Sequence, residues 1–253
     1  LDIYEMPIKG HTYVMTVDVA RGISNDYSAF VVIDATKAPY KIVAKYRNNE
    51  IKPIVFPNML KKVGDHYNKA YCLIEINDLG QQVADAMQFE LEYDNMMMVT
   101  QRGRAGQVLG GGFSGRGNQL GLRMTKGTKK IGTSNLKSLI EGDKLIVNDF
   151  DIIAELSTFI SRGKSFEAEQ GAHDDLVMCL VIFSWCANQR YFKELTNVDV
   201  RGQMFTEQQN AIEQDMAPFG FIDDGLNDPD GNNNSFFDDA GVLWSPVTYR
   251  KGE

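Results

Sequence analysis

Four acidic side chains stand at positions of the sequence where a carboxylate could take part in chemistry. Asp18 ends an apolar stretch that is typical of a β-strand. Glu75 interrupts a nearly continuous apolar run, which indicates a buried central strand. Asp174 and Asp175 directly precede an apolar run that must form a buried helix. The question is whether these acids meet in the folded chain.

Several carboxylates within a few ångströms repel one another strongly unless divalent cations hold them together. Such a cluster would therefore imply Mg²⁺ or Mn²⁺, with two ions about 3.5–4 Å apart that support phosphodiester hydrolysis. In this scheme Asp18 bridges both ions, Glu75 holds one, and Asp174 or Asp175 holds the other. His173 could orient water or a phosphate.

Each residue also has a purely structural interpretation. Asp174 or Asp175 alone is more simply a helix cap, and Asp18 could satisfy amides of the turn that follows it. Glu75 could pair with a buried lysine or arginine. His173 alone is more often a structural hydrogen-bonding residue. Asp26 is interpreted as closing the turn after Asp18 and supporting that carboxylate indirectly.

The elements that would position these acids can be read from hydrophobic patterns. The first half predicts a strand ending at Asp18, then strands at Ser28–Asp34 and Lys41–Arg47, a helix at Pro53–Asn68, a strand at Ala70–Ile76, a helix at Gly80–Tyr93 and a strand at Met96–Thr100. Short links make the first three strands an antiparallel meander. With the fourth strand paired beside the first, Asp18 and Glu75 would be neighbours.

The second half of the chain predicts shorter elements. These are a helix at Asn135–Glu141, a strand at Lys144–Asn148, a helix at Asp151–Ile160, a weak strand at Ser165–Glu169 and the buried helix at Leu176–Asn188. The fold class expected from the whole pattern is α/β, with a mixed sheet flanked by helices. A helix packed over that sheet could bring its amino-terminal acids to Asp18 and Glu75.

Charge is distributed unevenly along the 253 residues. The net charge of −8 resides entirely in residues 199–253, which hold 11 acids and 3 bases. Residues 95–140 hold eight basic residues and no acid, a pattern expected either of phosphate binding or of a solvated loop. The candidate DNA-binding residues are Arg102, Arg104, Arg116, Arg123, Lys126, Lys129 and Lys130.

The glycine-rich stretch 102–132 within this basic segment predicts a mobile loop or a loosely formed hairpin. It holds no G-x-x-x-x-G-K-[ST] phosphate loop. Composition predicts a folded domain at 1–198 and an acidic, partly ordered tail at 199–253. No apolar run is long enough to span a membrane, so no membrane partner is expected.

The ordered motifs resemble ribonuclease H-like nucleases, and more specifically the nuclease domain of the large terminase subunit of tailed bacteriophages, the DNA-packaging motor. The matching pieces are Thr16-Val-Asp-Val-Ala-Arg-Gly22, Asp26-Tyr27, Leu73-Ile-Glu-Ile-Asn77, Gly132-Thr-Ser-Asn-Leu-Lys-Ser-Leu-Ile140, Lys144-Leu-Ile-Val-Asn-Asp149 and His173-Asp-Asp-Leu-Val177. They span roughly residues 12–190. The Asp-Val and Leu-Ile-Glu motifs are weak singly, whereas the ordered set is fairly specific.

The resemblance implies a Mg²⁺- or Mn²⁺-dependent endonuclease that cuts concatemeric double-stranded DNA, with Asp18, Glu75 and one of Asp174 and Asp175 as catalytic acids. It further implies an ATPase domain in the same full-length protein, the portal and the small terminase subunit as partners, and a location in the cytoplasm of the infected bacterial host and transiently at the procapsid portal. No Walker motif is present, so this chain should cut without translocating.

Two alternatives remain open from the sequence. A junction resolvase or integrase of the same fold would use the same metals on a branched or end-joined substrate. A non-catalytic domain could instead keep the fold and dock on a portal or capsid protein through its acidic tail. Cleavage of linear DNA separates both alternatives from a terminase nuclease.

Overall fold

The computed structural model describes residues 1–20, 27–102, 106–110, 118–163 and 165–196, with only the backbone at Arg102, Phe236–Phe237 and Leu243–Trp244. The chain divides into two units, Leu1–Arg201 and Gly202–Glu253. In the second unit, β12 (Phe236–Phe237) pairs antiparallel with β13 (Leu243–Trp244). The candidate functional residues that the structure describes all lie in the first unit.

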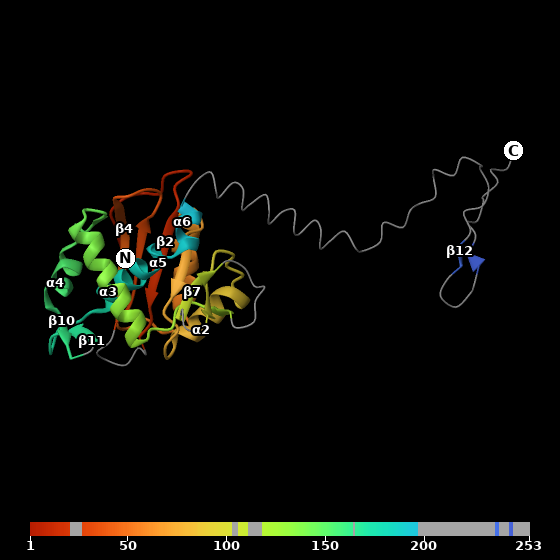
Figure 1. Cartoon of the computed structure of the whole chain (residues 1–253). Helices are drawn as coiled ribbons and strands as arrows, with labels where there is room; N and C mark the ends of the chain where they lie inside the picture. Colours follow the sequence, from red (N-terminus) through yellow and green to blue (C-terminus); the bar gives the residue numbers. More distant parts are fainter. Residues whose placement is uncertain are drawn as a thin grey trace. The chain divides into compact units, whose positions relative to one another are not determined.

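A mixed sheet organises the first unit (Figure 1). Its described strands are β1 (Asp2–Ile3), β2 (Tyr13–Asp18), β3 (Ser28–Asp34), β4 (Tyr40–Asn48), β5 (Tyr71–Ile74) and β9 (Leu145–Ile146), in the order β1-β4-β3-β2-β5 with β9 also beside β4. β2, β3 and β4 form an antiparallel meander. β5 runs parallel to β2. The predicted meander and the predicted pairing of the first and fourth strands are both confirmed.

Helices cover both faces of this sheet, and smaller sheets flank it. The helices are α1 (Phe56–His66), α2 (Gly80–Asp85), α3 (Lys126–Glu141), α4 (Phe150–Thr158), α5 (Asp175–Ala187) and α6 (Arg190–Thr196). The additional strands are β6 (Met98–Arg102) between β7 (Gly106–Gly110) and β8 (Asn118–Leu120), and the hairpin of β10 (Phe159–Arg162) with β11 (Ser165–Ala168). This confirms the predicted fold class, a mixed sheet flanked by helices.

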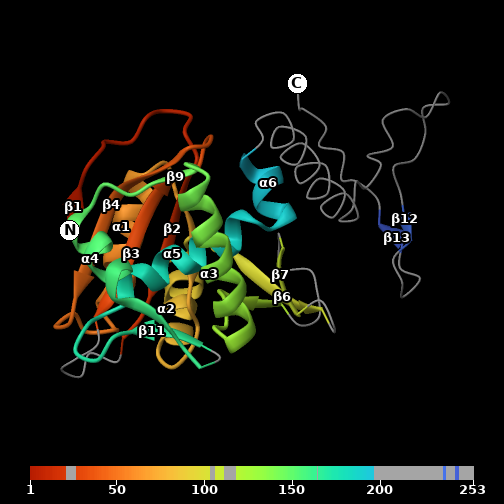
Figure 2. The same cartoon turned by 60° about the vertical axis from the view of Figure 1, so that its left-hand side comes forward.

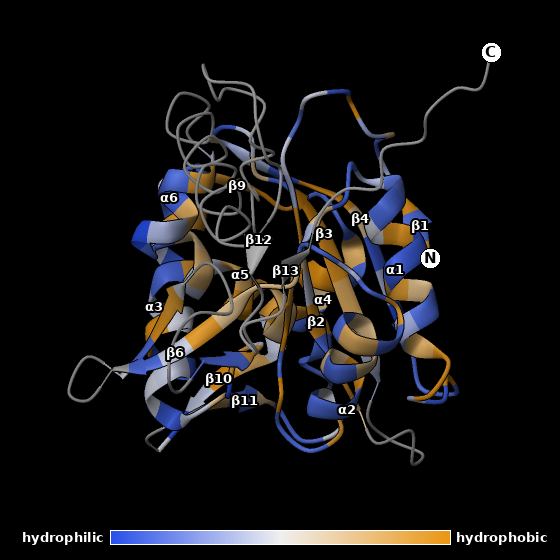
Figure 3. Ribbon diagram, turned by 90° about the vertical axis from the view of Figure 1, so that its right-hand side faces the viewer, coloured by the Kyte–Doolittle hydropathy of each residue, from blue (hydrophilic) through white to orange (hydrophobic). Residues whose placement is uncertain are grey.

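Strand alternation divides the hydrophobic core into two layers. Val14 and Leu73 face one layer, which is filled by α5 together with residues of α3 and α4. Met15 and Ile74 face the other, which is filled by α1 and α2. Figure 2 shows α3 and α5 together on one side of the sheet, and Figure 3 shows hydrophobic residues concentrated in the sheet strands. Asp18 lies four residues after Val14, and Glu75 lies two residues after Leu73, so both acids face the layer that contains α5.

α5 is buried along its whole length beyond Asp175. It runs between the sheet and α3, so apolar residues are favoured on all its sides. The enclosure of α5 fixes where its amino-terminal acids lie.

Of the helices that the structure describes, none combines the length and apolar character needed to cross a bilayer.

The boundaries of several predicted elements need correction. The helix predicted at Gly80–Tyr93 is α2 followed by a π-helical turn at Ala86–Glu90. The helix predicted at Asp151–Ile160 ends at Thr158, where Phe159 begins the unpredicted strand β10. In both cases the apolar spacing continues past the point where the backbone hydrogen bonding changes.

For the glycine-rich stretch 102–132, the predicted hairpin agrees with the antiparallel pairing of β6 with β7, whereas a helix start at its end was not predicted. The described parts of this stretch include β7 and β8, both paired with β6, and the first two turns of α3. α3 begins nine residues before the helix predicted at Asn135–Glu141, because Thr125 caps it by accepting a hydrogen bond from the Thr128 amide. Residues 103–105 and 111–117 lie outside the described residues.

The absence of a side chain at Gly132 lets α3 approach α5 closely. A Cβ at this position would lie 2.6 Å from the Val181 carbonyl oxygen and 2.7 Å from Val181 Cγ1. Gly127 on the same helix is different, since the nearest atom to its Cβ position is Thr125 Oγ1 at 3.7 Å. The glycine that misled the helix prediction therefore serves helix packing.

Replacing these two glycines should have opposite effects. Gly132→Ala should lower the free energy of unfolding by about 1–3 kcal/mol through overpacking against α5. Gly127→Ala should raise it by about 0.4–1 kcal/mol by restricting the unfolded chain. Urea denaturation of both variants checks this, and a stabilising Gly132→Ala would contradict the close α3–α5 contact.

Candidate active site

Asp18 and Glu75 lie side by side at the ends of parallel strands. Val17 pairs with Ile74 in the β2–β5 register, and the Glu75 amide donates to the Val17 carbonyl at 2.9 Å. Register neighbours on parallel strands point to the same face of a sheet. That face is the one covered by α5. The backbone therefore brings two partly buried carboxylates together beneath this helix.

The structure describes the surroundings of Glu75 and part of those of Asp18. Among the described residues, no lysine or arginine forms an ion pair with Glu75, and its Oε1 instead accepts a hydrogen bond from Asn77 Nδ2 at 2.9 Å. Asn77 is itself fixed by donating to the Met124 carbonyl at 3.0 Å. The Ala20 amide after Asp18 donates to Ser28 Oγ at 3.2 Å. Within the described residues, Glu75 is therefore held by an amide hydrogen bond rather than by an ion pair, and residues 21 and 22, whose amides Asp18 could satisfy, lie outside that part of the chain.

The start of α5 supplies the remaining two acids. Asp174 holds the N-cap position, but its side chain makes no capping hydrogen bond. The amides of Leu176 and Val177 instead donate to Oε2 of Glu155, at 2.8 and 3.1 Å. Asp174 and Asp175 thus hold the expected cap and first-turn positions, but these two amides are satisfied by Glu155 and not by Asp174. A carboxylate from α4 therefore caps this helix.

Glu155 belongs to the surroundings of these acids and was not predicted from the sequence. It is 4% exposed, and its Oε1 accepts a hydrogen bond from Arg47 at 2.6 Å. It therefore ties α4 and β4 to the start of α5. A signal was present, because Glu155 lies on the same helical face as Ile152 and Leu156 and an acid on an apolar face needs partners.

Asp175 carries an unusual buried oxygen. Its Oδ1 accepts a hydrogen bond from the Tyr27 amide at 3.4 Å, while Oδ2 is buried and has no hydrogen-bond partner. The His173 Nδ1 atom lies 3.9 Å from this Oδ2, and the His173 ring contacts the Tyr27 ring edge-on. His173 thus lies beside the acids as expected. Asp26 lies outside the described residues.

Burial and mutual repulsion disfavour the ionised form of these acids. Burial raises the pKa of Asp18 well above its usual value, and the charges of Glu75 and Asp175 raise it further. Burial also raises the pKa of Glu75 to about 7, against the opposing effects of Lys129 and Asn77. Burial and Glu155 raise the pKa of Asp175 to about 7. The electrostatics therefore couple the acids of β2, β5 and α5 into one cluster.

The donor set of this cluster suits a divalent cation. Within the part of the chain that the structure describes, no three acidic, histidine or cysteine side chains converge in a metal-ligating arrangement. The chemistry nevertheless fits, because all four candidates offer carboxylate oxygens, which hard cations such as Mg²⁺ and Mn²⁺ prefer. The orphaned Oδ2 of Asp175 is a buried acceptor that such an ion would satisfy.

The predicted DNA-binding residues are placed only in part. Arg104 and Arg116 lie outside the described residues, and only the backbone of Arg102 is described. The others lie at or near the start of α3, where Arg123, Lys126 and Lys130 are exposed. Lys129 differs from them, because its Nζ lies 3.4 Å from Asp174 Oδ2 within the acid cluster.

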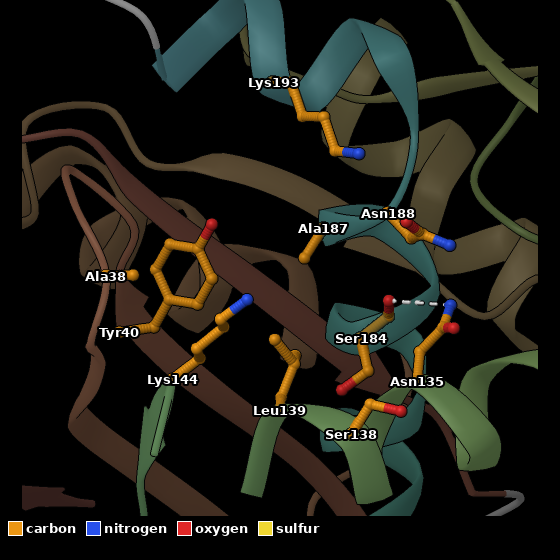
Figure 4. Close-up of a pocket in the computed structure, with 10 residues that line it drawn as sticks. All are labelled: Ala38, Tyr40, Asn135, Ser138, Leu139, Lys144, Ser184, Ala187, Asn188 and Lys193. Carbon is orange, nitrogen blue, oxygen red and sulfur yellow. Dashed lines mark hydrogen bonds between the residues drawn. The ribbon is translucent and has the colours of Figure 1, made fainter. Parts of the chain in front are cut away.

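A separate pocket lies at the other end of α5 (Figure 4). This cavity of about 280 Å³ is lined by residues of the last turn of α5 and by Tyr40, Lys144 and Lys193. The Asn135 side-chain amide donates to the Ser184 carbonyl at its wall, at 3.3 Å. None of the predicted site residues lines it, so it does not belong to the acid cluster.

Comparison with known proteins gives one family and a consistent set of structures. The model of the terminase RNase H-like domain matches residues 15–183. The large terminase nuclease of thermophilic phage G20c with bound cobalt is 22% identical, with a TM-score of 0.55 over 72% of this chain and 85% of that one. Its magnesium-bound form is 23% identical, with a TM-score of 0.53 over the same shares of the two chains.

A second phage provides a further structural match. The large terminase nuclease domain of Thermus phage P74-26 is 23% identical, with a TM-score of 0.53 over 72% of this chain and 83% of that one. These structures establish the fold. The residues matched by the family model include Asp18, Glu75, Asp174 and Asp175.

Glu155 can be tested by two substitutions of different severity. Glu155→Ala should lower the free energy of unfolding by about 3–5 kcal/mol, because it uncaps α5 and leaves the Arg47 charge without its buried partner. Glu155→Gln should cost less, since its amide oxygen can still accept from the α5 amides. Urea denaturation measures both, and equal costs would show that the capping oxygen contributes little.

The raised pKa values of Glu75 and Asp175 make stability depend on pH. Both carboxyls bind protons more tightly in the folded than in the unfolded chain, so their contribution is lost as pH rises from about 4 through about 7. Asp18 carries the same penalty because its pKa is also raised, so the Tm of Asp18→Asn in EDTA should exceed that of the wild type by an amount that grows over this range. A difference that shrinks with rising pH would contradict the coupling.

Proposed function

This chain belongs to the family of terminase RNase H-like domains, and we propose that it cuts concatemeric double-stranded DNA by metal-dependent hydrolysis of phosphodiester bonds. The observation that carries the proposal is the arrangement of acids around the start of α5. Asp18 and Glu75 reach this point from neighbouring parallel strands, and Asp174 and Asp175 reach it from the helix. Each acid contributes carboxylate oxygens, and Asp174 also pairs with Lys129.

Asp18, Glu75 and one or both of Asp174 and Asp175 would hold the metal, which we propose to be two Mg²⁺ or Mn²⁺ ions. Bound divalent cations supply an activated water and stabilise charge on the phosphate oxygens. Support comes from similar phage terminase nucleases, whose structures contain bound magnesium or cobalt. Oxygen-only ligation by this chain favours magnesium or manganese over softer metals.

Other residues of the chain keep these acids in position. Asn77 orients the Glu75 carboxylate through a hydrogen bond, and Glu155 holds the first turn of α5 through two amides. His173 lies at the solvent side of Asp175, where its ring can donate a hydrogen bond to water or to a phosphate oxygen. Such supporting residues typically affect metal affinity or activity 10–100-fold.

The start of α3 supplies a surface suited to the DNA backbone. Arg123, Lys126 and Lys130 are exposed there, and a cavity of about 550 Å³ beside them is lined by Gln101, Gln107, Gln119 and threonine residues. Basic side chains bind phosphates, and glutamine side chains can donate or accept hydrogen bonds. We assign these residues, with Arg102, Arg104 and Arg116, to DNA binding.

The remaining parts of the proposal follow from the terminase family. The ATPase domain of the same full-length protein, the portal and the small terminase subunit would be its partners. It would act in the cytoplasm of the infected bacterial host and transiently at the procapsid portal. The family match favours a terminase over a junction resolvase.

A nuclease assay tests the proposed function directly. Wild-type protein with Mn²⁺ should cut linear duplex and plasmid DNA. Asp18→Asn, Glu75→Gln and Asp174→Asn should each lower the rate by at least about a hundredfold, because losing a metal ligand costs more than losing a residue that only orients one. Asp65→Asn on α1, against the opposite face of the sheet, is the matched control and should cut normally.

Three outcomes would contradict the proposal. Full activity of Asp18→Asn would remove the acid cluster from the reaction. A wild-type protein that cuts no DNA with either metal would instead favour the non-catalytic docking domain. Preference for a four-way junction over linear duplex would favour a resolvase.

A further inference from the structure

Lys129 occupies a position unlike that of its basic neighbours. Its side chain is 18% exposed, and its ammonium lies 3.4 Å from Asp174 Oδ2 and 5.5 Å from the centre of the Phe159 ring. An ion pair and a cation–π contact therefore hold the charge inside the site. Lys126 and Lys130 are exposed and form no ion pair with any residue that the structure describes.

The packing of α3 against α5 makes this position a fixed one. Lys129 lies one turn before Gly132, where the backbone of α3 is pressed against Val181 of α5. Thr125 caps the same turn from its other side. The stem of Lys129 therefore starts from a rigid point that faces the first residues of α5.

The charge of Lys129 acts on more than its direct partner. It opposes the pKa increases that burial and repulsion impose on Asp18 and on Glu75. An ammonium and a divalent cation both need the carboxylate oxygens of this cluster, and they repel each other. Both cannot be held closely by Asp174 at the same time without a cost in free energy.

We infer that Lys129 competes with divalent ions for the Asp174 carboxylate, and that its ammonium would bind the phosphate of the bond to be cut once an ion engages Asp174. This inference rests on the proposed nuclease function and adds a phosphate-binding residue to it. When a divalent ion binds the Asp174 carboxylate, the Lys129 ammonium loses its ion-pair partner, and pairing with another anion becomes favourable. The DNA phosphate is the anion that the substrate brings, and the flexible lysine stem allows the exchange.

The inference predicts effects of opposite sign on metal binding and on cleavage. Lys129→Gln removes a cation that competes with the metal, so Mn²⁺ should bind about tenfold tighter, as expected for one charge a few ångströms away in partly screened surroundings. Cleavage at saturating Mn²⁺ should be at least about tenfold slower, because the phosphate loses a charged donor. A simple contact to DNA would leave metal binding unchanged.

The experiment uses the full 253-residue chain and measures Mn²⁺ binding by calorimetry without DNA, then single-turnover cleavage of a linear duplex. Lys129→Met is a second neutral variant that keeps an apolar stem against Phe159. Lys129→Arg keeps the charge and should retain an Mn²⁺ affinity near that of the wild type. Lys130→Gln makes the same charge change one residue away and should leave Mn²⁺ affinity unchanged.

The inference is supported if Lys129→Gln and Lys129→Met both bind Mn²⁺ more tightly and cleave DNA more slowly than the wild type. Lys130→Gln should show no increase in Mn²⁺ affinity. Unchanged or weaker Mn²⁺ binding in the neutral variants, with an active wild type, overturns it and leaves the nuclease function standing. A wild-type chain that neither binds Mn²⁺ nor cuts DNA overturns the nuclease function itself and this inference with it.

Discussion

The parallel pairing of β2 with β5 is the constraint on which the site depends. The register places Asp18 beside Glu75, and the alternation of side chains turns both acids toward α5. Two neighbouring carboxylates in partly buried positions are unfavourable for folding, yet the strands around them are apolar and well packed. A one-residue shift of β5 would turn Glu75 to the opposite face of the sheet and dismantle the site.

Contacts elsewhere in the first unit hold the helices around these acids in place. Glu155 caps α5 in place of the aspartates at its start, so the helix is satisfied without consuming their oxygens. Gly132 allows α3 to lie close enough to α5 for Lys129 to reach Asp174. The structure thus concentrates negative charge, supplies one cation of its own and leaves buried carboxylate oxygens for others.

The sequence predicted those parts of the fold and site that depend on local hydrophobic patterns, and it did not predict those that depend on contacts between distant residues. The apolar runs before Asp18, around Glu75 and after Asp175 correctly predicted the strands, the buried helix and the side-by-side placement of the first two acids. Glycine made α3 look like a loop, because the contact of Gly132 with Val181 joins residues far apart in sequence. The capping role of Glu155 and the inward position of Lys129 are likewise tertiary contacts, which local spacing does not encode.

The central claim is that the acids of β2, β5 and α5 bind divalent cations as one group. Crystals grown with Mn²⁺ and measured near the manganese absorption edge test it most directly, because anomalous density marks the metal without assumptions about the protein. We expect density within coordinating distance, about 2.2 Å, of oxygens from Asp18, Glu75 and at least one of Asp174 and Asp175. Density confined to other carboxylates, with none beside Asp18, would contradict it.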